Sequence, residues 1–428
     1  MGVQDGANMG LQEGDYDAMA ASEDVEHTLQ ICTQLQLRSV SRYKVQPPVP
    51  LALSPGPAAG NMYTIRYILG AALIIILAVV WNYITTSSSV HTFSRELELK
   101  NIAATRTTVQ RIDTHAHFLP PFYYDTLKRM GLDKEGPLNS MPKWNAKDHL
   151  AFMDKLGIET AILSISSPGA RLPCHTLQEA RTLAREVNNY GHMMAVTNPG
   201  RLQFFASHVL PDEGSVDEAI RALDTLEAAG VALLANSEGW YLGRPEFDPL
   251  MEVLNSRGAT IFVHPHSLPG TLNLEVPPFV VDFLLDTTRA AATLVMNNVT
   301  ARFPNLQWIL GHSGGFMPFA GYRIGSALSL VTGESAESFL QELRRFYVDT
   351  AVSSSPSALP STIAFLTTEH LTFGSDYHFA PNMVIERETG QLDTFLKLEL
   401  DSWHQINHRN AARVFGSRLN QRKEAPLN

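Results

Sequence analysis

Two histidines separated by one residue, His115 and His117, follow a short segment, 108–114, that carries the β-branched residues typical of strands. If that segment is extended, residues i and i+2 point to the same side, so both imidazole rings face one spot. Neutral imidazole is the commonest metal ligand among protein side chains. The pair therefore indicates half of a tetrahedral or five-coordinate metal site. The alternative is a solvated strand end that happens to carry histidines.

Three further ionisable residues each lie one or two positions after a different apolar segment later in the chain: His264, His312 and Asp376. A single histidine after a strand is more often structural, but four histidines and one aspartate in such positions indicate a metal site. The chain contains only 2 cysteines, which is too few for a disulfide framework or a thiolate metal cage. Histidine and carboxylate must therefore hold any metal ion.

The elements that position these residues follow one repeating pattern. From residue 107 onward, short β-branched segments alternate with helical ones such as 216–229 and 278–298, as in parallel βα units. Strands are expected at 108–114, 160–165, 203–210, 231–235, 260–263, 307–310, 346–349 and 371–374. Eight such units in about 310 residues are the number and size of a (β/α)8 TIM barrel, an α/β fold. Its active site lies at the carboxyl ends of the strands, where Ser164, Asn236 and Asp349 also gather.

The composition is that of a globular protein and narrows the functional classes. The chain has 428 residues, of which 44% are hydrophobic and 18% charged, as expected for a large folded domain with extensions. Its net charge of −10 argues against a nucleic-acid-binding surface. No basic run is long enough to follow a phosphate backbone either.

The N-terminal part of the chain differs from the rest. Residues 1–62 are polar and then rich in Pro, Gly and Ala, which predicts a disordered tail. The apolar segment that follows, flanked by Tyr and Trp, predicts a transmembrane helix over 63–85, with a buried core helix as the alternative. We therefore expect a single-pass membrane protein, with the barrel on the cytosolic side slightly favoured. Residues 86–106 form a linker, 107–418 the metal-dependent barrel and 419–428 a short tail.

Four short motifs in combination resemble a known family. They are His-x-His after the first expected strand, His-Pro after the fifth, Gly-His-x-Gly-Gly after the sixth and Gly-Ser-Asp after the eighth. Over residues 110–418 the chain resembles the amidohydrolase superfamily, and within it the branch typified by aminocarboxymuconate-semialdehyde decarboxylase. The segments 111–121, 152–158 and 163–169 are most similar to fungal 6-methylsalicylate decarboxylases.

The resemblance implies roles for particular residues. It implies a catalytic histidine at His312, a substrate wall at Trp240, and a substrate-binding Arg323 lent across a homodimer interface. It also implies one divalent metal ion held by His115, His117, His264 and Asp376. The lysine that bridges two ions in binuclear relatives is absent from the fourth strand, which favours a single ion. Three imidazoles and a carboxylate suit Zn²⁺ best, with Mn²⁺ as the alternative.

The reaction implied is metal-dependent, non-oxidative decarboxylation of a small hydroxylated aromatic carboxylic acid. A substrate similar to 6-methylsalicylate would give a product similar to m-cresol and CO₂, in polyketide secondary metabolism. A positioned acid, either Asp376 or His312, would protonate the ring carbon. The segment 137–144 offers only Lys143 where the semialdehyde decarboxylase carries an arginine for a second carboxylate, which favours a singly carboxylated ring.

Two other functional classes are compatible with parts of the sequence. A hydrolase on the same barrel would use water to open a lactone or amide, with Asp376 as the base. Sequence alone separates hydrolysis from decarboxylation poorly, because both use the same metal ligands. A non-catalytic, membrane-tethered binding protein is disfavoured, because no metal-binding or catalytic position has been lost.

Overall fold

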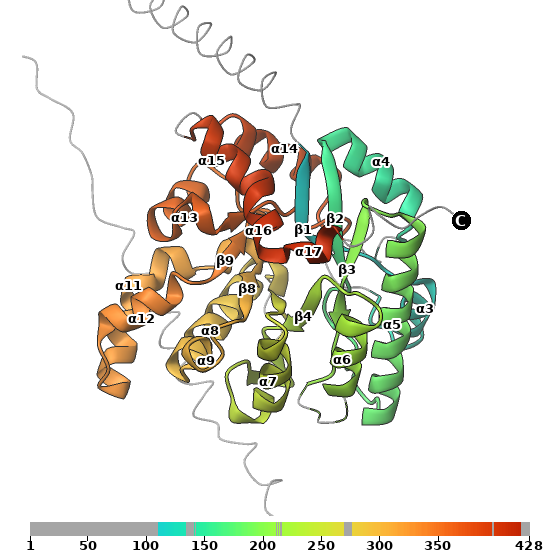
Figure 1. The fold of residues 1–428 in the computed structure, drawn as a ribbon, viewed down its shortest axis with the longest axis horizontal. Coiled ribbons are helices and arrows are strands. Elements are labelled where there is room, and N and C mark those ends of the chain that lie inside the picture. Colours follow the sequence, from blue (N-terminus) through green and yellow to red (C-terminus); the bar gives the residue numbers. More distant parts are fainter. Residues whose placement is uncertain are drawn as a thin grey trace, which may run out of the picture. The chain divides into compact units, whose positions relative to one another are not determined.

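Eight parallel strands form one sheet in the computed structural model of the protein, which describes residues 110–133, 141, 143–210, 212, 214, 216–268, 276–395 and 398–420. The sheet follows chain order, β1-β2-β3-β4-β7-β8-β9-β10 (Figure 1). The strands are β1 (Arg111–His117), β2 (Ile158–Ser164), β3 (Leu202–Ser207), β4 (Gly230–Leu234), β7 (Thr260–His264), β8 (Gln307–Leu310), β9 (Tyr347–Asp349) and β10 (Leu371–Thr372). A separate antiparallel pair, β5 (Asn236–Ser237) and β6 (Trp240–Tyr241), follows β4.

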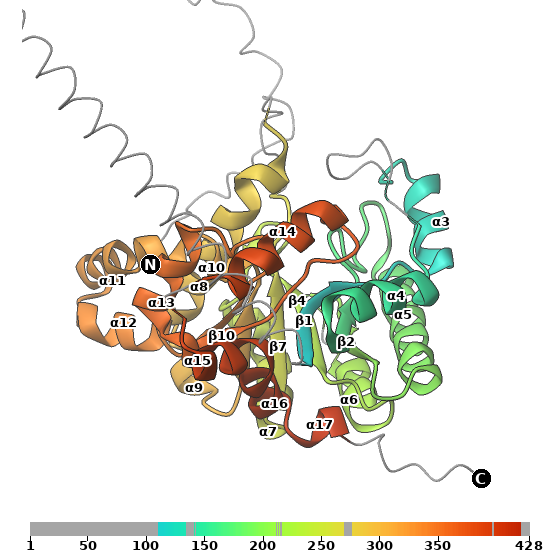
Figure 2. The same cartoon turned by 90° about the horizontal axis from the view of Figure 1, so that it is seen from above.

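The last strand returns to the first, so the sheet is a nearly closed barrel. The backbone N–H of Thr114 donates to the carbonyl of Phe373 at 2.9 Å, and the N–H of Asp376 donates to the carbonyl of His115 at 2.8 Å. Seen from above, the strands lie at the centre and the helices surround them (Figure 2). The prediction of eight strands in a barrel is confirmed.

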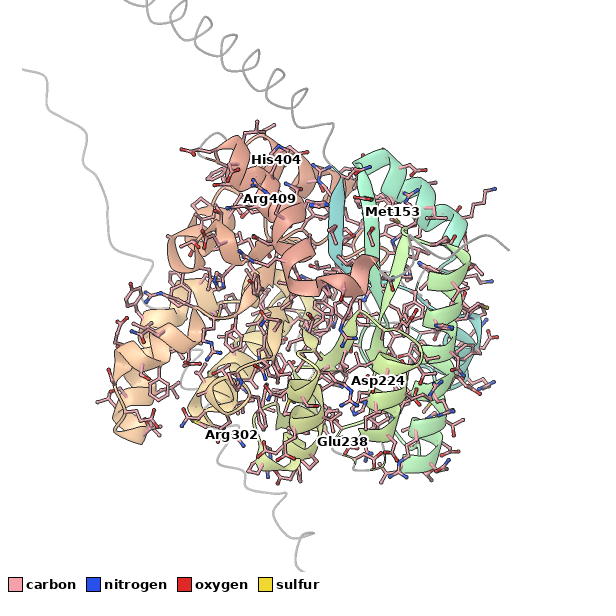
Figure 3. The ribbon with its side chains drawn as sticks, in the orientation of Figure 1. Met153, Asp224, Glu238, Arg302, His404 and Arg409 are labelled. Carbon is pink, nitrogen blue, oxygen red and sulfur yellow. The ribbon has the colours of Figure 1, made fainter. Side chains whose placement is uncertain are left out.

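Most helices lie between successive strands and cover the outside of the sheet, and the last four follow the final strand. They are α3 (Pro121–Arg129), α4 (Ala146–Leu156), α5 (Leu177–Thr197), α6 (Val216–Asp224), α7 (Asp248–Ser256), α8 (Asp282–Met296), α9 (Val299–Arg302), α10 (Gly311–Gly314), α11 (Met317–Thr332), α12 (Ala336–Leu343), α13 (Ala358–Leu366), α14 (Asn382–Asp393), α15 (Leu400–His404), α16 (Asn410–Phe415) and α17 (Ser417–Asn420). Short 3₁₀ turns are η2 (Pro245–Phe247), η3 (Pro278–Val280) and η4 (Thr368–His370), and η5 (Gln405–Arg409) is a π-helix. Charged side chains such as Asp224, Glu238 and Arg302 lie on the outer layer (Figure 3).

Local sequence signals explain where several helices begin and end. Helix α5 starts with a capping box, in which Thr176 and Glu179 satisfy each other's backbone N–H groups. Helix α4 starts at Asn145, whose side chain accepts from a first-turn N–H, and ends at Gly157 in the left-handed conformation. These caps set the lengths of the helices on either side of β2.

One layer of large side chains fills the barrel interior on the side opposite the carboxyl ends of the strands. Ile112, Ile162, Phe205, Phe262 and Ile309 come from five strands and are buried together. Helix α16 closes this end of the barrel with three of its own residues: Ala411, Val414 and Phe415. The polar residues at the carboxyl ends of the strands therefore stand on a packed floor, as in other barrels of this type.

Most strand boundaries differ from the expectation by one or more residues, and β1 and β10 are two examples. Strand β1 was expected to stop at Thr114, but its pairing with β2 continues to His117, which lies opposite Ser164. Strand β10 is two residues long, against four expected. A strand predicted from hydrophobic residues ends where polar residues begin. The strand in the structure continues through His115 and His117, because these polar side chains are buried as well.

The predicted membrane localisation is wrong. Among the described residues, no helix is both long enough and apolar enough to cross a bilayer. The expected tail 1–62, the transmembrane helix 63–85 and the linker 86–106 lie outside the described residues, as does most of the C-terminal tail 419–428.

Candidate metal centre

Strand β1 presents both of its histidines to the interior of the barrel. A register irregularity between Asp113 and Ala116 breaks the simple alternation of the strand. As a result His115 and His117 stand above the floor residue Phe262, whose ring centroid lies 4.7 Å from that of His115. Both histidines have 0% of their surface exposed. They are therefore not a solvated strand end.

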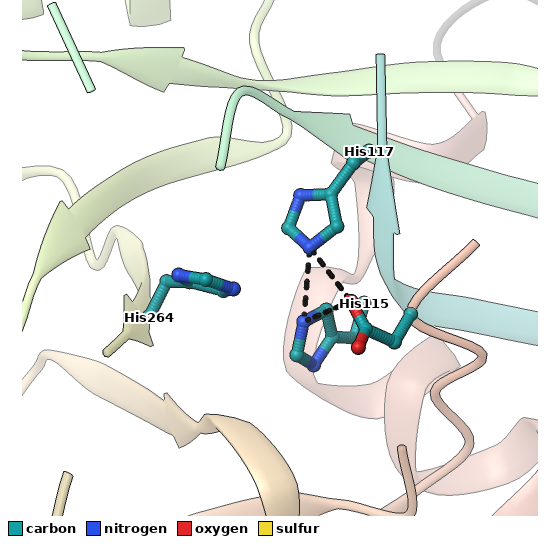
Figure 4. A group of neighbouring side chains, drawn as sticks. His115, His117 and His264 are labelled. Carbon is teal, nitrogen blue, oxygen red and sulfur yellow. Dashed lines mark hydrogen bonds and ion pairs between the residues drawn. The ribbon is translucent and has the colours of Figure 1, made fainter. Parts of the chain in front are cut away.

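Four ligand-type side chains converge at one point at the top of the barrel. One atom from each of His115, His117, His264 and Asp376 can be chosen so that all lie within 4.8 Å of one another. The Nε2 atoms of His115 and His117 are 3.1 Å apart, and His117 Nε2 lies 3.1 Å from Asp376 Oδ1. Figure 4 shows the rings of His115, His117 and His264 directed toward this point.

The other ring nitrogen of each histidine faces an acceptor. His115 Nδ1 lies 2.8 Å from Asp349 Oδ2, and His264 Nδ1 lies 2.8 Å from the carbonyl of Pro265. His117 Nδ1 lies 3.3 Å from the carbonyl of Ser164. An acceptor at Nδ1 places the proton there, which leaves the Nε2 lone pair for the centre. Two lone pairs facing each other at 3.1 Å repel unless a cation lies between them.

The electrostatics of the cluster fit a bound cation. Burial lowers the pKa of His117, and it lowers the pKa of His264 to well below the usual value for histidine. Both rings are therefore neutral. Burial acts against ionisation of Asp376, but its hydrogen bond with His117 and the surrounding histidines lower the pKa of this carboxyl, which is ionised. Burial also opposes a charge on His115, yet Asp349 and Asp376 raise its pKa. The neutral imidazoles of His117 and His264 and the ionised carboxylate of Asp376 are donors that a divalent metal ion takes, and His115 joins them when it gives up its proton to the ion.

His312 lies beside this cluster. Its ring centroid is 4.8 Å from that of His115 and 6.1 Å from that of His264. Its Nδ1 lies 3.2 Å from the carbonyl of Ala351, which leaves Nε2 as the second ring nitrogen for chemistry. Its backbone has φ 54° and ψ 53°, a left-handed conformation that Asp349 holds by accepting from the His312 N–H at 3.0 Å. His312 is not one of the four convergent residues.

The structure does not bring Trp240 and Arg323 to the cluster. Trp240 is 39% exposed on the β5–β6 hairpin, where the guanidinium of Arg244 lies 4.2 Å from its ring centroid. Arg323 is exposed on α11. Within the described chain, neither residue lies among those that line the pocket beside His264.

Two aspartates support the centre although the sequence analysis gave them no role. Asp349, at the end of β9, contacts His115 and the His312 N–H, and its side chain is fully buried. Asp286, from α8, accepts from the N–H of His266 at 2.8 Å and from Asn236 Nδ2 at 3.0 Å. These bonds join the loops that follow β4 and β7. A polar residue at a strand end marked Asp349, whereas no local signal marked Asp286.

A pocket opens beside the cluster between the carboxyl ends of β2, β3, β4 and β7. Apolar residues such as Ile165, Leu210 and Leu234 form most of its wall, and His264 lines one side. The lining next to His264 therefore offers mostly apolar contacts and a few polar groups.

The chain matches an established family model and several curated relatives. The model described as "Amidohydrolase" matches residues 112–417. Decarboxylase yanB of Aspergillus niger is 34% identical over 304 residues, covering 67% of this chain and 82% of its own. The 6-methylsalicylic acid decarboxylase of Penicillium expansum is 32% identical over 314 residues, covering 71% and 96%.

Solved structures share the fold at lower identity. The 5-carboxyvanillate decarboxylase of Novosphingobium aromaticivorans, solved with manganese, is 22% identical with a TM-score of 0.63, covering 72% of this chain and 97% of its own. A 2,6-dihydroxybenzoate decarboxylase with its substrate is 20% identical with a TM-score of 0.61, covering 72% and 99%. At this identity the likeness supports the architecture and not the activity.

Proposed function

The chain belongs to the amidohydrolase family, and from that membership we propose its reaction: metal-dependent, non-oxidative decarboxylation of a small hydroxylated aromatic carboxylic acid. The observation that carries the metal dependence is the convergence of three imidazoles and one carboxylate within 4.8 Å beside a mostly apolar pocket, and the curated relatives carry the choice of decarboxylation over hydrolysis. Relatives with 32–34% identity over most of their length are decarboxylases. The enzyme is a carboxy-lyase.

The four convergent residues are proposed as the ligands of one divalent ion: His115, His117, His264 and Asp376. Their Nε2 lone pairs and ionised carboxylate fit such an ion, as the Nδ1 contacts above indicate. We propose Zn²⁺ because three imidazoles and one carboxylate suit it, although a fold relative was solved with manganese. When bound, the ion supplies Lewis-acid stabilisation of negative charge on the substrate oxygens.

The protein's own residues bind the ring and move one proton. The ring carbon that bears the carboxylate accepts a proton, and its bond to the carboxylate carbon then breaks. The electron pair of that bond restores the aromatic ring while CO₂ leaves. His312 at Nε2 and Asp376 at its carboxylate are the two groups beside the centre that can hold the proton. The apolar wall of the pocket offers the ring apolar contacts.

The proposed substrate is 6-methylsalicylate or a close analogue, within polyketide secondary metabolism. The relative from Penicillium expansum carries the name of this activity and is matched over 96% of its length. Purified, metal-loaded protein incubated with 6-methylsalicylate should release equal amounts of m-cresol and CO₂. Absence of m-cresol together with hydrolysis of an aromatic lactone or amide would overturn decarboxylation in favour of hydrolysis.

We also propose that the enzyme acts as a homodimer through α11. This helix exposes large apolar residues: Phe319 is 87% exposed, Tyr322 64% and Leu330 89%. Monomers rarely leave such a face uncovered. Arg323 is exposed on the same helix and does not line the pocket of its own chain, so a role in substrate binding requires a second copy. Light scattering should give twice the chain mass, and Leu330→Glu should give the chain mass.

A further inference from the structure

The pocket beside His264 is lined by an arginine side chain, Arg171, whose N–H donors are only partly used. Arg171 lies on the loop between β2 and α5, and its Nη2 forms an ion pair of 3.1 Å with Glu238 Oε2. Its Nε and Nη1 atoms are shielded from solvent and hydrogen-bond to no described residue. These two atoms carry three N–H donors. Buried donors are normally paired, so Arg171 is a site for an acceptor that the described chain does not supply.

A second polar group of the same pocket is in the same situation. Ser207 ends β3 and is 3% exposed, and its Oγ hydrogen-bonds to no described residue. Its backbone N–H is already used, because it donates to Asn188 Oδ1 at 2.7 Å. The pocket thus combines an apolar wall with a few polar groups, the arrangement that orients an aromatic ring through its substituents.

The charge around Arg171 indicates which kind of oxygen it binds. Glu238, whose side chain is 62% exposed at the outside of the fold (Figure 3), already compensates the positive charge. The negative charge of this glutamate would repel a second carboxylate on the ring, whereas it would not repel a neutral hydroxyl. Arg171 is also unsuited to the reacting carboxylate, because stabilising that charge before CO₂ leaves would favour the ground state over the transition state.

We propose that Arg171 and Ser207 bind a neutral oxygen substituent on the side of the ring away from the reacting carboxylate. The preferred substrate is then a 2-hydroxybenzoate with an additional hydroxyl at ring position 4 or 5. This inference rests on the proposed function and narrows its substrate class. Arg171 is a specificity residue, so its effect should fall on binding of the hydroxylated ring and not on the rate of decarboxylation of bound substrate.

The test measures binding without turnover. Nitro analogues, in which a nitro group replaces the carboxylate, cannot lose CO₂; 3-methyl-2-nitrophenol mimics 6-methylsalicylate, and 5-methyl-4-nitrobenzene-1,3-diol adds the hydroxyl at position 4. An isomer with the hydroxyl at position 5 completes the set. Calorimetry on the metal-loaded protein, at a pH low enough to keep the hydroxyl para to the nitro group neutral, should show that one hydroxylated analogue binds about 10- to 100-fold more tightly than the parent, and that Arg171→Met removes this advantage.

Arg185→Met is the matched control, because Arg185 is 58% exposed on α5 and pairs with Glu218 outside the pocket. It should keep the full preference for the hydroxylated analogue. Ser207→Ala provides a second variant if Arg171→Met does not fold, and it should reduce the same preference. An unchanged ratio of affinities in the folded Arg171 and Ser207 variants overturns this inference alone. Failure of the unaltered protein to bind any of the analogues overturns the proposed function as well.

Discussion

Replacement of Asp349 by asparagine tests whether the buried carboxylate orients His115 for metal binding. Asp349 Oδ2 contacts His115 Nδ1 at 2.8 Å, and Oδ1 accepts from the backbone N–H groups of His312 at 3.0 Å and Ala351 at 2.9 Å. An asparagine has only one terminal oxygen, because its other terminal atom is an amide nitrogen that donates. It can therefore accept either from His115 or from the two backbone N–H groups, but not from both. Keeping its oxygen toward the two N–H groups preserves two hydrogen bonds, so this orientation is preferred.

The amide nitrogen then faces His115 Nδ1, and a donor there moves the imidazole proton to Nε2. His115 can no longer offer its Nε2 lone pair without first changing tautomer. Loss of a carboxylate partner behind a metal-binding histidine typically weakens metal binding by about 10- to 100-fold, or about 1.4 to 2.8 kcal/mol. The free energy of unfolding of the metal-free protein should change little, because the two backbone hydrogen bonds remain.

The assay is competition for Zn²⁺ against a fluorescent chelator, with thermal unfolding of the metal-free protein measured in parallel. Asp393→Asn is the control: Asp393 pairs with Arg111 and accepts from Trp403 Nε1 at 2.9 Å, away from the cluster. This control should lower the unfolding temperature and leave the metal affinity unchanged. An Asp349→Asn protein that binds Zn²⁺ as tightly as the unaltered protein would refute the reasoning.

Three further predictions concern the same centre and its surroundings. His264→Ala or Asp376→Ala should abolish metal binding and turnover together, and elemental analysis of the unaltered protein should give one equivalent per chain; two equivalents would contradict a single ion. His312→Asn should keep its metal and lose about 10²- to 10⁴-fold in turnover, whereas loss of the metal would make His312 a ligand. Burial lowers the pKa of His149 to about 3, below its unfolded value of about 6.5, so the unfolded chain binds the extra proton and stability falls as the pH drops from about 6.5 to 3. His149→Phe should reduce the slope of unfolding free energy against pH in that interval by up to about 1.4 kcal/mol per pH unit, and an unchanged slope would show that His149 is protonated in the folded protein.

The sequence was sufficient for the barrel and for the residues that converge, because both depend on local patterns. Each expected strand was a short β-branched segment, and His264, His312 and Asp376 each stand just after such a segment. A parallel barrel brings all strand ends to one face, so no knowledge of long-range contacts was needed to place these residues together.

Roles that depend on contacts between distant segments could not be predicted from local patterns. Asp349 contacts His115 although the two are 234 residues apart in the sequence. Asp286 contacts Asn236 from α8, the helix after β7. Trp240 was expected in the substrate wall; its ring lies against the guanidinium of Arg244, and its role in substrate binding stays a prediction. The unpaired donors of Arg171 become visible only when the neighbouring side chains are in place.

The glycine of the Gly-Ser-Asp motif shows how a short motif and a long-range contact are connected. A Cβ atom at Gly374 would lie 2.9 Å from the Cβ of His115 and 3.0 Å from the Cβ of Asp349, closer than side chains tolerate. Only glycine therefore lets the segment after β10 approach β1 and β9 closely enough for Asp376 N–H to bond to the His115 carbonyl. That bond holds Asp376 in its left-handed conformation, φ 60°, with its carboxylate beside His117. The motif is thus a packing requirement as much as a chemical one, because the aspartate at its third position can reach the cluster only when its first position has no side chain.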